Sequence, residues 1–262
     1  GWRHKRLRGE EYDRFIEQFV EAFKHNFPHA LCQWEDFSKQ TAFSVRDKYL
    51  NEVISFNDDI QGTGSIALAG IIAAMKVKNE KMTDQVYLVH GAGAGGIGIA
   101  EQIQTELMEQ GMTPQEARDR IFTLDSRGVV TSNRNLEQYK LKFAKDPESM
   151  SWLSSPKDNT LLNVVKNEKV TVLIGTSGQP GCFTKEIVKA VGEHTDRPVI
   201  LPLSNPTTKT EALPEEVYKW TDGKALVATG SPFDPVHHGG RDYRIGQMNN
   251  AFVFPGVGLG VI

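Results

Sequence analysis

Two pairs of adjacent carboxylates are the first residues in this sequence whose types and spacing could do chemistry. Glu35 and Asp36 follow one short apolar stretch, and Asp58 and Asp59 follow another. Hard divalent cations such as Mg²⁺ and Mn²⁺ prefer oxygen ligands, so carboxylates gathered from two loops would suit either ion. The alternative is that all four are solvated loop acids. Aromatic residues flank both pairs, and a charged group in an apolar setting usually has a partner, which favours a cation site.

A glycine-rich segment at residues 91–98 has the order expected of a phosphate-binding turn. It follows an apolar stretch typical of a strand and opens a stretch typical of a helix. In a dinucleotide-binding unit, one glycine makes the tight turn and another lets the backbone approach the pyrophosphate, which meets free N–H groups at the helix N-terminus. A flexible glycine turn is the alternative. The residues predicted to contact a cofactor here are Gly91, Gly93, Ala94, Gly95 and Gly96.

Asp125 ends the next predicted strand, where the second strand of a Rossmann unit holds the adenosine ribose. It lies further from Gly93 than the ~20 residues usual for this fingerprint, and an intervening turn accounts for the excess. We predict cofactor contacts from Asp125 and Ser126. A carboxylate here accepts the 2′-hydroxyl of NAD and repels the 2′-phosphate of NADP, so NAD is favoured. Ser126, Arg127 and Lys140 could accommodate that phosphate, which leaves NADP possible, although Lys140 also fits a solvated lysine.

Side-chain amides follow the later predicted strands, where an open α/β sheet has its ligand crevice. Asn205 follows a predicted strand over 199–203, and Asn249 lies in an amide-rich turn over 247–250. Such amides can donate and accept hydrogen bonds to a nicotinamide or a dicarboxylate without adding charge. The alternative for each is an Asx turn.

Helices and strands in a regular order must position these residues. Apolar residues at helical spacing predict a helix over 9–26, and short strands over 30–34 and 53–56 deliver the two carboxylate pairs. Another helix, over about 41–50, separates those strands. Downstream, the predicted strands cover 86–89, 121–124, 170–174, 199–203 and 225–228, and the predicted helices cover 62–77, 95–111, 184–194 and 214–220. Strands that alternate with helices are typical of βαβ units.

The fold class predicted from this order is α/β. We expect a Rossmann-type, doubly wound, mostly parallel sheet together with part of a second α/β domain. Residues 60–248 would form the dinucleotide-binding domain. Residues 1–59 would be the C-terminal part of a substrate and metal domain, and residues 249–262 would return to that domain.

Composition excludes several functional classes. Of the 262 residues, 39% are hydrophobic and 24% charged, so neither disorder nor a fibrous repeat is expected. The 30 Lys and Arg against 33 Asp and Glu give a net charge of −3. Such a balance does not indicate the excess of basic residues that is typical of nucleic-acid-binding proteins. The longest mostly apolar stretch, residues 64–77, is shorter than the ~20 residues of a membrane helix, so no membrane contact is expected. Cys32 and Cys182 form no CxxC motif, which suits a reducing, cytoplasmic location.

Taken together, these motifs resemble the malic enzyme family, which includes NAD(P)-dependent malic enzymes and malolactic enzymes. The matching blocks keep the family's order and spacing over essentially the whole chain, and they lie at 33–37, 56–63, 91–93, 203–207, 230–236 and 249–256. The resemblance implies oxidative decarboxylation of L-malate to pyruvate and CO₂. Hydride would pass from C2 to NAD, or to NADP, and a divalent Mg²⁺ or Mn²⁺ would assist.

Roles for individual residues are also implied by that resemblance. The matching positions imply metal ligation by Glu35, Asp36 and Asp59, orientation of the general base by Asp58, and contacts with substrate and nicotinamide by Asn205 and Asn249. A cation held by carboxylates would act as a Lewis acid on the C2 oxygen of the substrate.

The family's general-base lysine and general-acid tyrosine lie on the N-terminal side of the Glu-Asp motif. Lys5, Tyr12 and Lys24 lie outside any matching motif, and Met248 stands where relatives often have glycine. We therefore expect a C-terminal portion of such an enzyme, as the apolar end at 258–262 also suggests. Two alternatives stay open, namely a malolactic enzyme that forms L-lactate with bound NAD and a nucleotide- and metal-binding fragment without catalysis. Full-length relatives are commonly dimers or tetramers, so a homodimer or homotetramer is expected.

Overall fold

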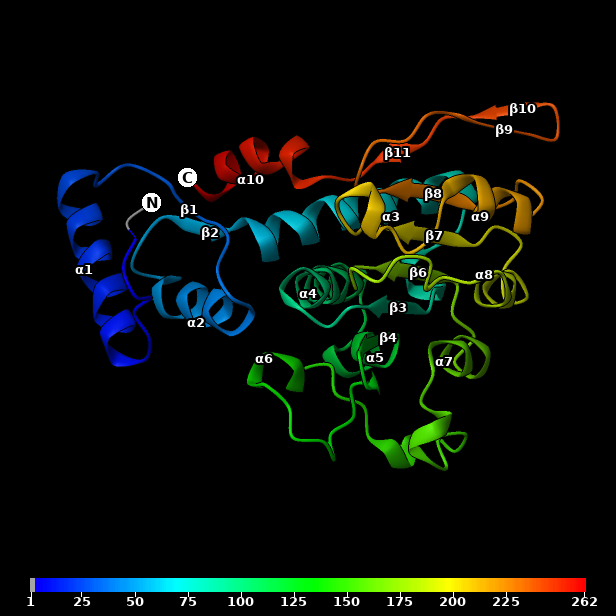
Figure 1. Ribbon diagram of the computed structural model, residues 1–262, viewed down its shortest axis with the longest axis horizontal. Helices are drawn as coiled ribbons and strands as arrows, with labels where there is room; N and C mark the ends of the chain where they lie inside the picture. Colours follow the sequence, from blue (N-terminus) through cyan, green and yellow to red (C-terminus); the bar gives the residue numbers. More distant parts are fainter. Residues whose placement is uncertain (1–2) are drawn as a thin grey trace.

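Within residues 3–262, which the computed structural model describes, seven strands form a central sheet in the order β11-β8-β7-β6-β3-β4-β5 (Figure 1). Every neighbouring pair in this described sheet is parallel except β4 and β5. The strands are β3 (Tyr87–His90), β4 (Ile121–Asp125), β5 (Gly128–Val129), β6 (Val172–Gly175), β7 (Val199–Pro202), β8 (Leu226–Thr229) and β11 (Gly246–Gln247). The predicted α/β fold with a mostly parallel sheet is confirmed.

Helices cover both faces of this sheet because successive side chains of a strand point to opposite sides. Val89 of β3 packs in one apolar cluster with α3 and α4, whereas its neighbour Leu88 packs in a second cluster with α7, α8 and α9. Burial on both faces explains why the strands are continuous apolar runs in the sequence. The helices of this lobe are α3 (Thr63–Lys78), α4 (Ala94–Glu109), α5 (Pro114–Asp119), α6 (Gln138–Leu141), α7 (Leu161–Asn167), α8 (Lys185–Gly192) and α9 (Pro214–Trp220).

The order of the strands reverses direction between β3 and β6. Along the chain, β4 adds to one side of β3, whereas β6 and β7 add to the other side. In an open parallel sheet, loops leave the strand ends in opposite directions at such a point and leave a crevice between them. This topology places the glycine-rich turn after β3 at the centre of that crevice.

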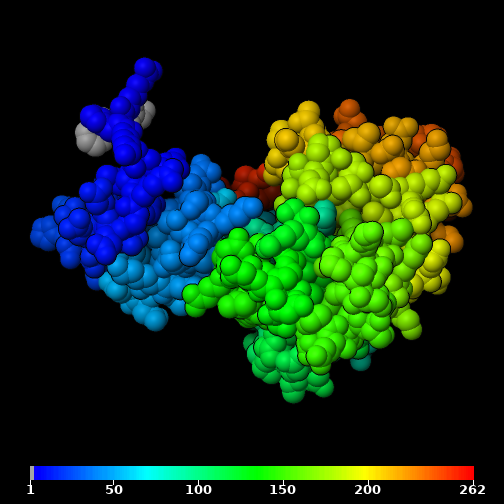
Figure 2. Space-filling model, turned by 60° about the horizontal axis from the view of Figure 1, so that its bottom comes forward, coloured from blue at the N-terminus to red at the C-terminus, as the bar shows by residue number. Residues whose placement is uncertain are grey.

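A smaller lobe lies beside the large one and contains most of the first sixty residues (Figures 1 and 2). Its strands β1 (Cys32–Trp34) and β2 (Ser55–Asn57) pair in parallel, and helices α1 (Glu10–Asn26) and α2 (Lys39–Tyr49) pack around Trp34. A π-helical turn at Asp58–Gly62 then connects β2 directly to α3.

The C-terminal helix α10 (Phe254–Val261) returns to the small lobe and contacts β2 (Figure 1). Gly258 permits this close approach, since a Cβ there would lie 2.8 Å from Leu31 Cδ2.

Neither α10 nor α7 was predicted from the sequence, and the strands β9 (Val236–His238) and β10 (Arg241–Tyr243) were also missed. The division into domains at residues 59 and 248 stays a prediction.

One helical segment in the described residues, Asp58–Lys78, is long and apolar enough to cross a membrane by length and composition. It exceeds the predicted apolar stretch of residues 64–77 because the π-helical turn and α3 are continuous. Ala67 and Ile71 of this segment are fully buried in the core cluster shared with α4. Packing against α4 and the sheet thus buries part of this segment, 39% of its most apolar window.

Candidate functional site

A cleft of about 810 Å³ runs along the C-terminal ends of the central strands. The glycine-rich turn lies in its wall between β3 and α4, Asp125 lies toward one end, and the loops after β6 and β7 line another part. Asp36 and Asp59, from the carboxylate cluster, also line it. Predicted cofactor and metal residues from both lobes therefore border one cavity.

The glycine-rich turn has a backbone shape that only small residues allow. Gly91 has φ +125°, and a Cβ there would lie 2.5 Å from the Thr176 carbonyl oxygen. A Cβ on Gly96 would lie 2.0 Å from the Gly91 oxygen. No side chain of the described residues caps α4 at Gly93, so its first N–H groups are left for a ligand. All five residues predicted in this turn line the cleft: Gly91, Gly93, Ala94, Gly95 and Gly96.

Asp125 lies at the C-terminal end of β4 and pairs with two basic side chains. Its carboxylate accepts hydrogen bonds from Arg134 at 2.5 Å and from Lys140 at 3.3 Å. Burial alone would raise the pKa of Asp125, but hydrogen bonds from Arg134 and from the Arg127 backbone lower it overall. The group is thus a carboxylate at neutral pH, as a partner for a ribose hydroxyl must be to accept two hydrogen bonds. Ser126 lines the cleft beside it.

The interpretation of Lys140 as a solvated lysine is wrong. Only 7% of Lys140 is exposed, and its ammonium pairs with Glu137 at 2.9 Å as well as with Asp125. Arg134, which sequence reasoning missed, shares the same acceptor. The negative charges of Asp125 and Glu137 together balance the positive charges of Arg134 and Lys140.

Lys39 is a second cleft residue that sequence reasoning missed. It is the first residue of α2, in the small lobe, yet a Cβ on Gly93 would lie 3.5 Å from Lys39 Cε and 3.9 Å from Nζ. The Lys39 side chain makes no hydrogen bond or ion pair with any other residue in the range 3–262. Its ammonium is therefore available to an anion bound at the glycine-rich turn.

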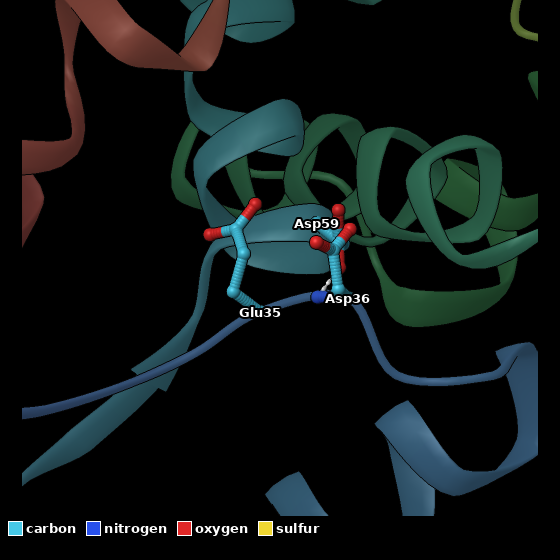
Figure 3. Close-up of side chains that lie close together, drawn as sticks. All are labelled: Glu35, Asp36 and Asp59. Carbon is cyan, nitrogen blue, oxygen red and sulfur yellow. Dashed lines mark hydrogen bonds between the residues drawn. The ribbon is translucent and has the colours of Figure 1, made fainter. Parts of the chain in front are cut away.

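Three carboxylates from two loops form the predicted metal cluster. Glu35, Asp36 and Asp59 each have an oxygen within 4.8 Å of the others (Figure 3). The backbone N–H of Asp36 donates to the Asp59 carboxylate at 2.9 Å, which ties the loop after β1 to the turn after β2. Because β1 and β2 are parallel neighbours, their C-terminal ends bring the two carboxylate pairs together.

The electrostatics of this cluster fit a cation. Burial raises the pKa of Glu35, and the nearby carboxylates of Asp58 and Asp59 raise it further. Burial also raises the pKa of Asp59, and the Asp36 carboxylate adds to the effect. Crowded carboxylates repel one another, and a divalent ion bound between them would remove that cost. The oxygen-only donor set suits Mg²⁺ or Mn²⁺, so the residues present fit such an ion, and their ligand role stays a prediction.

Asp58 differs from its neighbour in what its carboxylate contacts. One oxygen accepts a hydrogen bond from Asn250 at 2.8 Å, whereas the other is buried without a hydrogen-bond partner in the described residues. A Cβ on Gly62 would lie 1.9 Å from that second oxygen, so glycine is needed there. The π-helical turn that carries Asp58 is a geometry frequent at functional sites. A buried carboxylate with one unsatisfied oxygen is suited to hold a further polar group.

The two predicted amide residues lie close to one common loop. Asn205 lines the cleft and accepts a hydrogen bond from Ser231 Oγ at 2.6 Å. Asn249 donates to the Gly230 carbonyl at 3.3 Å and accepts from the Ala251 N–H at 2.9 Å. Asn249 therefore has the local geometry of the alternative, an Asx turn, and is not among the residues that line this cleft. The substrate role of both stays a prediction.

Comparison with known proteins gives a consistent result for the whole chain. The model of the malic enzyme NAD-binding domain matches residues 60–262, and that of the malic enzyme N-terminal domain matches residues 1–50. Two proteins called NAD-dependent malic enzyme, from Photorhabdus laumondii and Acinetobacter baylyi, are each 46% identical over 264 residues. Both alignments cover 100% of this chain but 47% of the relative, so the chain spans about half the length of these relatives.

Solved structures agree with the sequence matches. The NAD-dependent malic enzyme of Thermotoga maritima has a TM-score of 0.73 and 25% identity, with 97% of this chain and 59% of the other covered. A malic enzyme from Pyrococcus horikoshii has a TM-score of 0.68 and 26% identity over 93% of this chain and 52% of the other.

Proposed function

Because this chain belongs to the malic enzyme family, we propose that the full-length protein oxidatively decarboxylates L-malate to pyruvate and CO₂, with reduction of NAD. The observation that carries this proposal is the shared cleft. It joins a dinucleotide-type turn and Asp125 to carboxylates that are suited to a divalent cation. The oxidation and the decarboxylation of one small acid need both sets of groups within reach of the same substrate.

The cation would be held by Glu35, Asp36 and Asp59. When bound, Mg²⁺ or Mn²⁺ supplies a Lewis acid that polarises the C2 oxygen of malate and stabilises the negative charge that follows loss of CO₂. The Asp36 N–H keeps the Asp59 carboxylate in place, which preserves the donor set before a ligand arrives. Asp58, held by its hydrogen bond from Asn250, would orient the group that takes the substrate proton.

The cofactor would bind along the cleft, with its pyrophosphate at the N-terminus of α4. Asp125 would accept hydrogen bonds from the adenosine ribose, and its charge favours NAD over NADP. Two relatives with the printed name NAD-dependent malic enzyme support this preference. Asn205 would contact the substrate or the nicotinamide from the loop after β7.

Replacing Asp125 with serine should shift the cofactor preference toward NADP. Arg134 and Lys140 would lose their shared carboxylate and could pair with the 2′-phosphate, since a charge-assisted pair contributes about 1 to 2 kcal/mol. We expect the ratio of NADP to NAD affinity to rise by at least about tenfold in titrations of the full-length protein. Lys140→Ala, which removes only one cation, should not raise that ratio. An unchanged ratio in Asp125→Ser would contradict the assigned orientation of the cofactor.

Replacing Lys39 with methionine should weaken NAD binding by about fivefold, because one exposed charge next to a phosphate contributes roughly 1 kcal/mol. The loss should shrink at high salt, where such charges are screened. Lys48→Met is the matched control, since Lys48 lies on the same helix but pairs with Glu17 outside the cleft. Equal NAD affinities in Lys39→Met and Lys48→Met would refute a role for Lys39.

The reaction itself is tested by incubating the full-length protein with L-malate, NAD and Mn²⁺. Malate-dependent formation of NADH together with pyruvate is expected. Formation of lactate without net NADH would indicate a malolactic enzyme instead. Cofactor binding without any turnover of malate would indicate a nucleotide- and metal-binding protein that has no such activity.

We also propose that the full-length protein is a cytoplasmic homodimer or homotetramer. Three large apolar side chains of the small lobe, Phe15, Phe19 and Phe27, are more than two-fifths exposed and could be covered in an assembly. Light scattering on the purified protein measures the state, and a monomer at micromolar concentration would contradict this proposal.

A further inference from the structure

Glu211 is a carboxylate that lies completely buried under the cleft floor, with no exposed surface. One of its oxygens accepts three hydrogen bonds, from the Ser177 N–H at 2.8 Å, the Ser177 hydroxyl at 2.9 Å and the Ser204 hydroxyl at 2.5 Å. The other oxygen accepts from the Ser204 N–H at 3.3 Å. Both serines line the cleft, so Glu211 lies directly beneath its surface.

These hydrogen bonds connect two separate loops. Ser177 lies in the loop after β6, and Ser204 lies in the loop after β7. The Ser204 hydroxyl also accepts from the Gly178 N–H at 2.9 Å, and the Ser177 hydroxyl accepts from the Gln179 N–H at 3.2 Å. The two hydroxyls therefore link the Glu211 carboxylate to the backbone N–H groups of residues 178 and 179.

The Glu211 side chain fits against the end of β6 because residue 175 is glycine. A Cβ on Gly175, at the end of β6, would lie 2.5 Å from Glu211 Cδ. No ion pair reaches Glu211 within the part of the chain that the structure describes. A buried charge is costly unless hydrogen bonds satisfy it, and a fully satisfied buried network is rigid. The Glu211 carboxylate accepts from four donors, which an apolar side chain of the same size would leave unpaired.

We propose that Glu211 is a positioning residue for the nicotinamide half of the bound cofactor. The inference rests on the proposed NAD-linked function. Asp125, on β4, marks the adenosine end, and the sheet order β4-β3-β6-β7 places the two serine loops on the opposite side of the glycine-rich turn. Glu211 therefore fixes the part of the cleft that receives the nicotinamide riboside, including the loop that carries Asn205.

Glu211→Gln in the full-length protein tests this role through two ligands. Glutamine has the same shape as glutamate. If its amide oxygen accepts from the three donors that now reach one Glu211 oxygen, its NH₂ group would face the Ser204 N–H, and two donors would oppose each other. ADP contains only the adenosine and pyrophosphate halves of NAD. We expect the variant to bind NAD about tenfold more weakly than wild type, and ADP within about twofold. Glu216→Gln, an exposed glutamate in the nearby helix α9, should leave both affinities unchanged.

The outcomes separate this inference from the proposed function. Wild-type protein that binds no NAD would refute the function, whereas unchanged NAD affinity in Glu211→Gln, or an equal loss for NAD and ADP, would refute the positioning role. Should Glu211→Gln not fold, Ser204→Ala decides, since it removes the Ser204 hydroxyl that donates to Glu211 and accepts from the Gly178 N–H. A loss of NAD affinity without a loss of ADP affinity is expected, and unchanged affinities would overturn the proposal. In a double-mutant cycle, the effects of Ser204→Ala and Glu211→Gln on NAD binding should be less than additive.

Discussion

Asp59→Asn in the full-length protein is expected to weaken Mn²⁺ binding by roughly 100-fold and to abolish divalent-dependent turnover of malate. The substitution removes the charge of one of three carboxylates whose oxygens lie within 4.8 Å of one another. Asparagine can still accept the Asp36 N–H with its amide oxygen, so the turn itself should persist. Calorimetric titration with Mn²⁺ measures the affinity without relying on activity.

Asp47→Asn provides the control for that experiment. Asp47 is an exposed carboxylate of the same lobe, on α2, and pairs with Arg46 rather than with the cluster. Its replacement should leave Mn²⁺ affinity within about twofold of wild type. Wild-type Mn²⁺ affinity in Asp59→Asn would contradict the assignment of the cluster as the metal site.

Gly96→Ala should have the second large effect, on both stability and cofactor binding. In most helix positions alanine stabilises relative to glycine by about 1 kcal/mol. At position 96, however, the added Cβ would lie 2.0 Å from the Gly91 oxygen and 2.9 Å from Thr176 Oγ1, so the turn must move. We expect the free energy of unfolding to fall by about 3 kcal/mol and NAD binding to be lost.

Gly192→Ala tests whether the effect is specific to the turn. Gly192 ends α8, away from the cleft, and a Cβ there meets only Pro198 at 4.0 Å. Urea denaturation should show unchanged or increased stability for this variant, with normal NAD affinity. A Gly96→Ala protein with wild-type stability would contradict the packing described for the turn.

Much of the fold follows from local patterns in the sequence. Buried strands such as β3 and β6 are continuous apolar runs, and α1 carries a clear apolar stripe, so these elements were predicted correctly. Thr113 and Glu116 form a capping box where α5 begins, a start signal that can be read from the local sequence. By contrast, α10 contains three glycines in eight residues, a composition of low helix propensity. Its helical form depends on packing against β2, which no local pattern reveals.

The candidate site was predictable where its residues occur in motifs. Both carboxylate pairs and the glycine-rich turn have distinctive neighbours, and the structure brings Glu35, Asp36 and Asp59 together. Lys39 and Glu211 have no such signal. Lys39 reaches the turn only because the two lobes meet, and Glu211 is buried only because the loops after β6 and β7 converge on it. Residues whose surroundings come from distant parts of the chain cannot be recognised from spacing alone.

The most direct test of the central claim measures all products of one reaction. Full-length protein with L-malate, NAD and Mn²⁺ should form pyruvate, CO₂ and NADH in equal amounts, and chelation of the cation should stop all three together. Lactate without accumulated NADH, or pyruvate formation that continues after chelation, would contradict NAD-linked, cation-dependent oxidative decarboxylation by this protein.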